Sequence, residues 1–149
     1  MKPQILVLIA MFIVSCQSPL DVSQFHLGEQ NLSNHEVKMI RAEANYRYGH
    51  HLLTEDRLDQ HGHYFNIRWA KSALLNKRQP TTITLYYRQA DQGNDARVKS
   101  RTIAPEEKRH VEFAITGDEY QLSGKILSWT VELSQGGQIL QSEQSFLWT

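Results

Sequence analysis

Apolar side chains alternate with polar ones along most of this chain, and that period of two limits what the chain can fold into. In the segment His110–Thr116, for example, Val111, Phe113 and Ile115 fall on one side of an extended backbone. A period of two gives a strand with one buried and one solvated face, whereas a helix needs apolar residues three or four positions apart. The chain is therefore expected to fold from strands.

Seven segments carry this strand signal, and turn signals such as Asp91–Asp95 and the glycine pair Gly136-Gly137 separate them. The predicted strands are 40–48, 63–69, 81–89, 98–104, 110–116, 125–134 and 139–148. No long helix and no alternation of strands with helices accompanies them. Short strands at spacings of about 10 to 15 residues are typical of an antiparallel sandwich. The predicted fold class is therefore all-β, a seven-stranded sandwich of two sheets.

The same alternation predicts which side chains form the core. The strand 98–104 is polar, and its Lys99 and Arg101 are charges that discourage edge-to-edge pairing. The positions expected to point inward in the other strands are Phe65, Ile67, Trp69, Ile83, Leu85, Tyr87, Val111, Phe113, Ile115, Leu127, Trp129, Val131 and Leu133.

The arrangement over residues 36–148 resembles the immunoglobulin-like and fibronectin type III class. The run Asp118-Glu119-Tyr120 resembles the tyrosine-corner region of that class, which implies that the Tyr120 hydroxyl returns to upstream backbone. Trp69 resembles the tryptophan buried in the core of such domains. The cysteine pair of antibody domains is absent, and a transthyretin-like sandwich fits almost as well. Such an architecture does not fix a function.

The N-terminus carries a targeting signal. A positive start, Met1-Lys2, precedes the ten-residue apolar run 5–14, which is too short to span a bilayer. Ile13-Val14-Ser15-Cys16 resembles the bacterial lipobox, and Cys16 is the only cysteine. The resemblance implies removal of residues 1–15 and acylation of Cys16, where two or more acyl chains give stable attachment. By the same resemblance, Gln17 rather than Asp after the cysteine favours the outer membrane, facing the periplasm.

Three regions follow from these signals: a signal peptide 1–15, a lipidated tether 16–35 and a sandwich domain 36–149. The tether is rich in Gln, Ser, Asn and Asp. The whole chain has 16 basic and 16 acidic side chains, so no large field of one sign is expected. That balance argues against nucleic acid as a partner and against a polybasic membrane contact.

Four histidines are the one cluster of side chains that suggests a ligand site. Neutral imidazoles are good ligands for zinc, copper or nickel, and they also change charge between about pH 5 and 8. The ordinary alternative is a solvated loop and strand end. A metal or small-ligand carrier is accordingly the second functional hypothesis, with the candidate ligands His50, His51, His61 and His63.

Catalysis has little support in the sequence. Acylation consumes the only thiol, and no Gly-x-Ser-x-Gly turn or phosphate-binding glycine loop occurs. No cofactor is expected beyond the covalent lipid on Cys16. Tyr64, Tyr86 and Trp148 are out of phase with the inward positions or lie at the terminus, so they are expected to be exposed anchors of a protein contact. The leading hypothesis is a lipid-anchored, non-catalytic interaction or structural module, an accessory subunit of an envelope complex.

Overall fold

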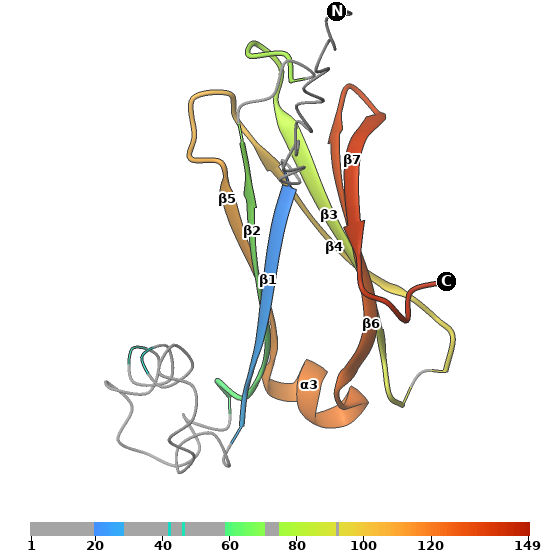
Figure 1. The fold of residues 1–149 in the computed structure, drawn as a ribbon. Coiled ribbons are helices and arrows are strands. Elements are labelled where there is room, and N and C mark those ends of the chain that lie inside the picture. Colours follow the sequence, from blue (N-terminus) through green and yellow to red (C-terminus); the bar gives the residue numbers. More distant parts are fainter. Residues whose placement is uncertain (1–19, 29–41, 43–45, 47–58, 71–74, 92) are drawn as a thin grey trace, which may run out of the picture.

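The computed structural model describes residues 20–28, 42, 46, 59–70, 75–91 and 93–149. Within them, seven antiparallel strands and one short helix form a sandwich of two sheets (Figure 1), which confirms the predicted fold class. The elements are β1 (Leu20–Leu27), β2 (Gly62–Trp69), β3 (Thr81–Gln89), β4 (Arg97–Ile103), β5 (His110–Thr116), α3 (Gly117–Ser123), β6 (Ile126–Gln135) and β7 (Gln138–Gln144).

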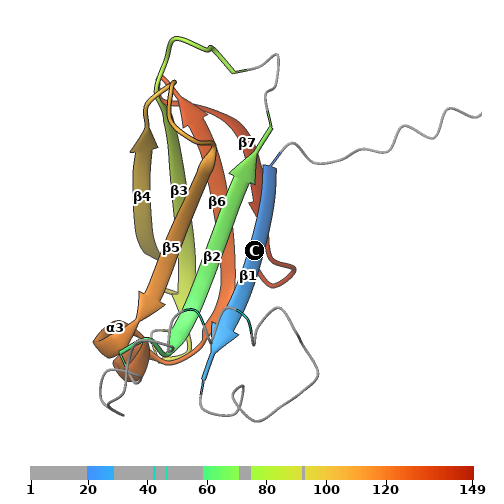
Figure 2. The same ribbon diagram turned by 90° about the vertical axis from the view of Figure 1, so that its left-hand side faces the viewer.

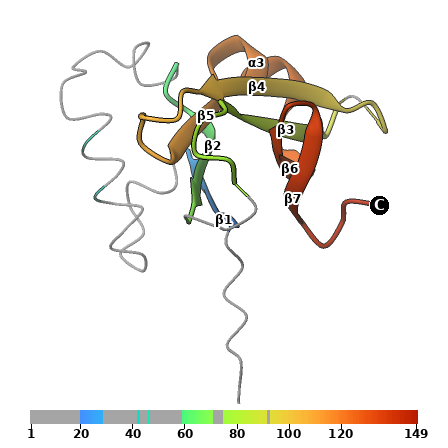
Figure 3. The ribbon, with the colours of Figure 1, turned by 90° about the horizontal axis from the view of Figure 1, so that it is seen from above.

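One sheet has the strand order β1-β2-β5 and the other has the order β4-β3-β6-β7. Seen from above, the two sheets lie face to face (Figure 3). The connections from β2 to β3, from β4 to β5 and from β5 to β6 each pass from one sheet to the other, as in the Greek-key connections of immunoglobulin-like sandwiches. Helix α3 lies at one end of the sandwich, on the path from β5 to β6 (Figure 2).

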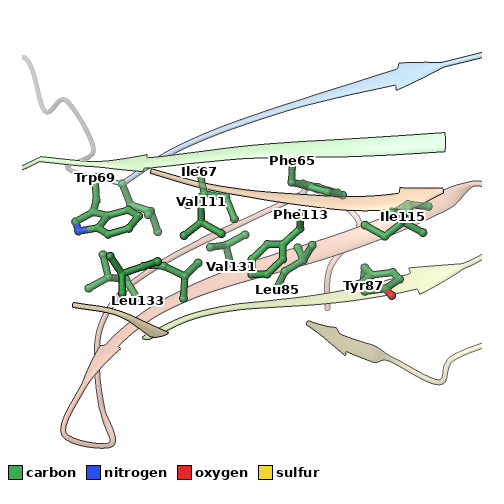
Figure 4. Packing of buried hydrophobic residues seen from close by; sticks show 14 residues of the cluster. Phe65, Ile67, Trp69, Leu85, Tyr87, Val111, Phe113, Ile115, Val131 and Leu133 are labelled. Atoms are coloured by element: carbon green, nitrogen blue, oxygen red, sulfur yellow. The ribbon is translucent and has the colours of Figure 1, made fainter. Parts of the chain in front are cut away.

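The core lies between the sheets, where inward side chains of both sheets meet (Figure 4). Burial of these side chains removes apolar surface from water, which is the main favourable contribution to folding. All but two of the inward positions predicted between residues 63 and 134 are buried, and Trp129 is a partial exception that packs half-buried against the cluster. The buried ones are Phe65, Ile67, Trp69, Ile83, Leu85, Tyr87, Val111, Phe113, Ile115, Val131 and Leu133.

Leu127 is the second exception, and its predicted inward position is wrong. The pairing of β3 with β6 shifts between Arg88 and Gln89, so that Ser128 lies opposite Arg88 while Ile126 lies opposite Gln89. This bulge inserts one extra residue and changes the phase of the strand. Ile126 is consequently buried at 8% exposure, and Leu127 is 53% exposed.

Strand β1 lies in the stretch that was predicted to be a tether, so that prediction is wrong for residues 20–27. Leu20 pairs with Trp69 and Leu27 with Gly62, and both leucines are fully buried. The register places Gln24 opposite the inward Phe65, so Gln24 also lies on the inner face of β1. On that face, the apolar residues at the start of the strand are followed by polar ones. That change breaks the apolar alternation on which the sequence prediction depended.

The strand predicted at 40–48 lies outside the described residues except for Ala42 and Tyr46. Those two residues have helical backbone and are exposed, so they do not support a half-buried strand. The first strand of the sandwich is β1 instead. The predicted signal peptide and Cys16 also lie outside the described residues. In the part of the chain that is described, no helix has the length and apolar character needed to cross a bilayer.

Each seam between the sheets is crossed by a charged side chain that reaches a backbone group. On one side, Lys99 of β4 donates to the carbonyl oxygen of Ala114 in β5, at 2.8 Å. On the other, the Glu143 carboxylate of β7 accepts a hydrogen bond from the backbone of Val22 in β1. Inward-pointing charges at edge strands oppose pairing with further chains. Lys99 therefore lies on an edge strand with its charge directed inward, and its role in protecting that edge stays a prediction.

Gly62 begins β2 where there is no space for a side chain. Its φ is +152°, and a Cβ atom there would lie 2.1 Å from the carbonyl oxygen of Ile115 in β5. This close approach of two backbones sets the start of β2 directly against β5, and it places the following residue, His63, between the sheets.

The bulge in β6 gives a direct test of the core. Leu133→Ala removes a fully buried side chain and is expected to cost about 2 to 5 kcal/mol in the free energy of unfolding. Leu127→Ala, in the same strand, is expected to cost less than about 0.5 kcal/mol because its side chain is exposed. Urea denaturation of both variants measures the difference. Equal losses would show that β6 has the phase predicted from the sequence and no bulge.

Candidate functional site

Two polar clusters lie at the end of the sandwich that α3 occupies. The histidine cluster consists of His26, His63 and Tyr120. The Glu119 network joins that residue of α3 to side chains of β3 and β4, namely Tyr87, Arg97 and Lys99. Both clusters include residues of α3, so the helix contributes to each.

The pairing of β1 with β2 forms the histidine cluster. His26 and His63 lie opposite each other in the register, with ring centroids 4.7 Å apart. Tyr120 lies against both rings, and its hydroxyl is 2.6 Å from Nε2 of His26. Nε2 of His63 accepts a hydrogen bond from the backbone N–H of Ile126, at 3.4 Å.

That hydrogen bond fixes the tautomer of His63. A nitrogen that accepts a proton donor does not carry a proton itself, so the proton of the neutral ring lies on Nδ1. Nδ1 is buried and has no hydrogen-bond partner among the described residues. A buried donor without an acceptor is costly, which makes this atom the most unusual feature of the cluster.

Burial keeps both imidazoles neutral at pH 7. It lowers the pKa of His63 to about 4, and the nearby His26 and Lys125 add to the effect. Burial also lowers the pKa of His26, with further contributions from Lys125 and His61. The charged or titratable groups that face the pair are thus Lys125, His61 and the Tyr120 phenol, and burial raises the pKa of that phenol. Among the described residues, no carboxylate contributes to the lowered pKa of either ring.

The Glu119 network holds α3 on the four-stranded sheet. The Glu119 carboxylate accepts a very short hydrogen bond from the Tyr87 hydroxyl and another from Lys99, at 2.8 Å, and lies 3.7 Å from Arg97. Desolvation acts to raise the pKa of Glu119, but these partners outweigh it, so the pKa lies below its usual value. Burial, together with Glu119, raises the pKa of Tyr87. A phenol held protonated in this way is a hydrogen-bond donor and no nucleophile.

The structure brings together only part of the predicted histidine site. His63 belongs to the histidine cluster, and His61 is half-buried and close enough to act on the pKa of His26. His50 and His51 lie outside the described residues. Among the residues that are described, no group of three or more His, Cys, Asp or Glu side chains is arranged to hold a metal ion.

Two members of the cluster were missed from the sequence. His26 lies in the stretch predicted as a tether, and only the β1 register places it opposite His63. Tyr120 was expected to bond upstream backbone, but its hydroxyl bonds the His26 ring instead. His26 lies an even number of residues after Leu20 and Val22, so the three residues share one face of the strand. That spacing was the sequence signal for His26.

The three aromatic residues predicted as exposed partner contacts are covered to different degrees. Tyr64 is 1% exposed, so the prediction is wrong for it. Its ring stacks on Phe25 at 5.1 Å, and its hydroxyl donates to the carbonyl oxygen of Gln60. Tyr86 is half-buried. Trp148 is also half-buried, beneath the Arg88 guanidinium at 4.3 Å from the ring centroid.

Exposed apolar side chains instead project from the segment 145–149, which we call the C-terminal turn. Ser145 is fixed to Trp129 of β6 by a backbone hydrogen bond of 2.9 Å, and its hydroxyl contacts the same residue. The N–H of Trp148 donates to the Ser145 carbonyl, which closes a four-residue turn. The two central residues, Phe146 and Leu147, are 97% and 64% exposed.

A guanidinium holds the end of this turn. Arg88 of β3 stacks on Trp148 and donates to the backbone oxygen of Thr149, at 3.2 Å. Gln144 donates to the Trp148 carbonyl. The turn is thus attached to two strands, and its apolar residues are presented by an ordered backbone.

Comparison of the chain with family models, with curated proteins and with solved structures finds no match. The function therefore has to be argued from the chain itself.

The buried imidazoles predict a stability that depends on pH. A lowered pKa in the folded state means that the unfolded chain binds the proton more tightly. The contribution of His63 is therefore fully present above about pH 6.5 and is lost as the pH falls toward 4, to a total of about 3 kcal/mol. Urea denaturation across this range measures the slope.

His63→Phe is expected to flatten the slope, because the variant has no imidazole at that position to protonate. His110→Ala is the matched control, since that histidine is exposed. An unchanged slope in His63→Phe would contradict the burial of His63.

Proposed function

We propose that this protein is a lipid-anchored, non-catalytic module of the cell envelope that contacts a protein partner through its C-terminal turn. The anchor is the acylated Cys16, and the proposed location is the outer membrane, facing the periplasm. The partner is a protein of the envelope to which this sandwich is an accessory or structural subunit.

The exposure of Phe146 and Leu147 is the observation that carries the proposal. Adjacent large apolar side chains that are 97% and 64% exposed are unfavourable in water, and aromatic residues such as Phe146 contribute strongly to the energetics of protein interfaces. The turn that presents them is held by Ser145 and Arg88. An ordered turn loses less conformational entropy on binding than a flexible tail does.

Photo-crosslinking in intact cells tests the partner contact. A photoreactive amino acid at Phe146 is expected to give one protein adduct of defined mass, and the same probe at Ile139, which is 55% exposed on β7, is the matched control. Leu147→Ser is expected to reduce the Phe146 adduct about tenfold, because it removes half of the apolar pair. Equal adducts from both probe positions, unchanged by Leu147→Ser, would refute a contact at the turn.

Labelling of cells with a palmitate analogue tests the anchor. The wild-type protein is expected to incorporate the label and to remain with membranes after carbonate extraction. Cys16→Ser is expected to lose all of the label, because the chain has no other cysteine. Mass spectrometry that finds an unmodified thiol on the mature protein would exclude the lipid anchor.

A second candidate function is the binding of a metal or small ligand at the histidine cluster, together with His50, His51 and His61. The unpaired Nδ1 of His63 supports the small-ligand version, because a buried N–H without an acceptor is a place where an acceptor atom of a ligand can bind. A metal ion could bind Nδ1 only after the proton has left that nitrogen. The nearby Lys125 opposes a bound cation. Addition of zinc or copper that leaves the thermal midpoint of the protein unchanged would exclude the metal version of this function.

A further inference from the structure

The start of β1 sets how far the sandwich can lie from the acyl chains. Only residues 17–19 separate Cys16 from Leu20, the first residue of β1. Four steps along an extended chain span at most about 14 Å. Even this upper limit is less than twice the screening length of about 8 Å at physiological ionic strength. A sandwich attached through an acylated Cys16 therefore lies within electrostatic reach of the lipid headgroups.

The position of Leu20 also defines which end of the sandwich faces the anchor. Leu20 pairs with Trp69, the last residue of β2. Figure 2 shows the start of β1 at the same end as the connections from β2 to β3, from β4 to β5 and from β6 to β7, with α3 at the opposite end. We call the first the anchor-side end, with described residues 75–80, 104–109 and 136–137. The second is the α3 end, with described residues 59–61, 90–91, 93–96 and 117–125.

The two ends carry opposite charge among these described residues, although the chain as a whole is balanced. The anchor-side end has more basic than acidic side chains, Lys77, Arg78, Lys108 and Arg109 against Glu106 and Glu107. The α3 end has the reverse, with Lys125 against Asp59, Asp91, Asp95 and Asp118, while the charge of Glu119 is paired with Lys99 and Arg97. A whole-chain charge count cannot detect this separation of charge between the two ends. For that reason the balanced net charge of the sequence argued against a basic membrane contact.

Two of the basic side chains also border one concave site. Lys77 and Arg109 line a hollow of about 40 Å³ at the anchor-side end, between the β2–β3 and β4–β5 connections, and Glu107 and apolar side chains line it with them. Lys77, Arg78 and Lys108 are exposed, and Arg109 is half-buried. The cations at this end outnumber the carboxylates, and each can donate charge-assisted hydrogen bonds to a phosphate group.

We infer that the anchor-side end binds the headgroups of anionic phospholipids in the bilayer that holds the acyl chains. The inference rests on the proposed acylation of Cys16. Lys77, Arg78, Lys108 and Arg109 contact lipid phosphates, and the acidic α3 end is repelled by the same surface. Attraction at one end and repulsion at the other hold the strands upright on the membrane.

Fluorescence energy transfer to labelled headgroups tests this orientation in the acylated protein. Acylation consumes Cys16, so a new cysteine is the only free thiol for a donor dye. The positions are Gln79→Cys at the anchor-side end and Asn94→Cys at the α3 end, both exposed. In vesicles of phosphatidylcholine with phosphatidylglycerol, transfer from position 79 is expected to exceed transfer from position 94 at least twofold. Similar transfer from both positions would overturn the inference.

Lipid charge and salt separate headgroup binding from the effect of a short tether alone. Vesicles of phosphatidylcholine without the anionic lipid, or high salt, are expected to reduce the difference between the two positions, because both remove the electrostatic attraction. A difference in transfer between the two positions that is the same in both kinds of vesicle and at all salt concentrations would also overturn the inference. The short tether would then be the sole cause of the orientation.

A matched pair of charge reversals tests the residues. Lys77→Glu and Lys125→Glu change the net charge equally but at opposite ends, and both side chains are exposed. Lys77→Glu is expected to reduce the transfer difference severalfold, since one basic side chain near an anionic surface contributes about fivefold in binding. Lys125→Glu is expected to leave or increase it. Equal effects of the two reversals would show that net charge alone matters.

The failure of this inference differs from the failure of the proposed anchor. Mass spectrometry of Cys16 decides whether the acyl group is present before any vesicle is made. An acylated protein with no preferred orientation refutes only the headgroup contact. An unacylated protein refutes the anchor, and the inference fails with it.

Discussion

A single lysine that points into the sandwich from an edge strand connects most of the features described above. Lys99 contacts the backbone of β5 in one sheet and Glu119 in α3, while its own strand belongs to the other sheet. A partly buried charge is costly unless hydrogen bonds replace water, and here a carbonyl and a carboxylate do so. The same pair fixes α3 against β4. Because α3 also carries Tyr120, the position of this helix determines how well the two histidines are shielded from solvent.

The neutral state of the histidine pair is a consequence of that arrangement. His63 is buried beneath Tyr120 and Ile126, and the charged group that acts on it is the cation Lys125. All of the nearby acidic charge of Glu119 is directed to Lys99, Arg97 and Tyr87 instead. The polar side chains at the α3 end thus form two separate groups. The charged Glu119 network lies on one side of α3, and the neutral histidine cluster lies on the other. Such a division explains why the two clusters titrate so differently although one helix serves both.

The strands could be predicted from the sequence wherever apolar residues alternate without interruption. Six of the seven predicted strands overlap observed ones. In β2, β3, β5 and β6 the inward positions are mostly apolar side chains, whereas β4 and β7 are largely polar edge strands that the neighbouring turn signals delimit. The prediction failed at β1, where Gln24 and His26 occupy inward positions, and at Leu127, where a bulge adds one residue. Tyr64 is buried on the outer face by stacking on Phe25, a contact between strands that are remote in sequence. For the histidine cluster, the sequence indicated His63, but no pattern in the sequence showed that His63 lies opposite His26.

The distance of the C-terminal turn from the anchor-side end limits what the turn can contact. The turn is fixed to Trp129, and six residue-to-residue steps along β6 lead from Trp129 to Gln135 at the anchor-side end. At about 3.3 Å per residue, that separation is about 20 Å along the strand. On a domain that stands upright on headgroups, Phe146 and Leu147 are therefore held well above the bilayer surface and cannot insert into it. The proposed protein partner then has to reach to this height, so the proposed partner contact and the proposed membrane contact lie at different places on one small molecule.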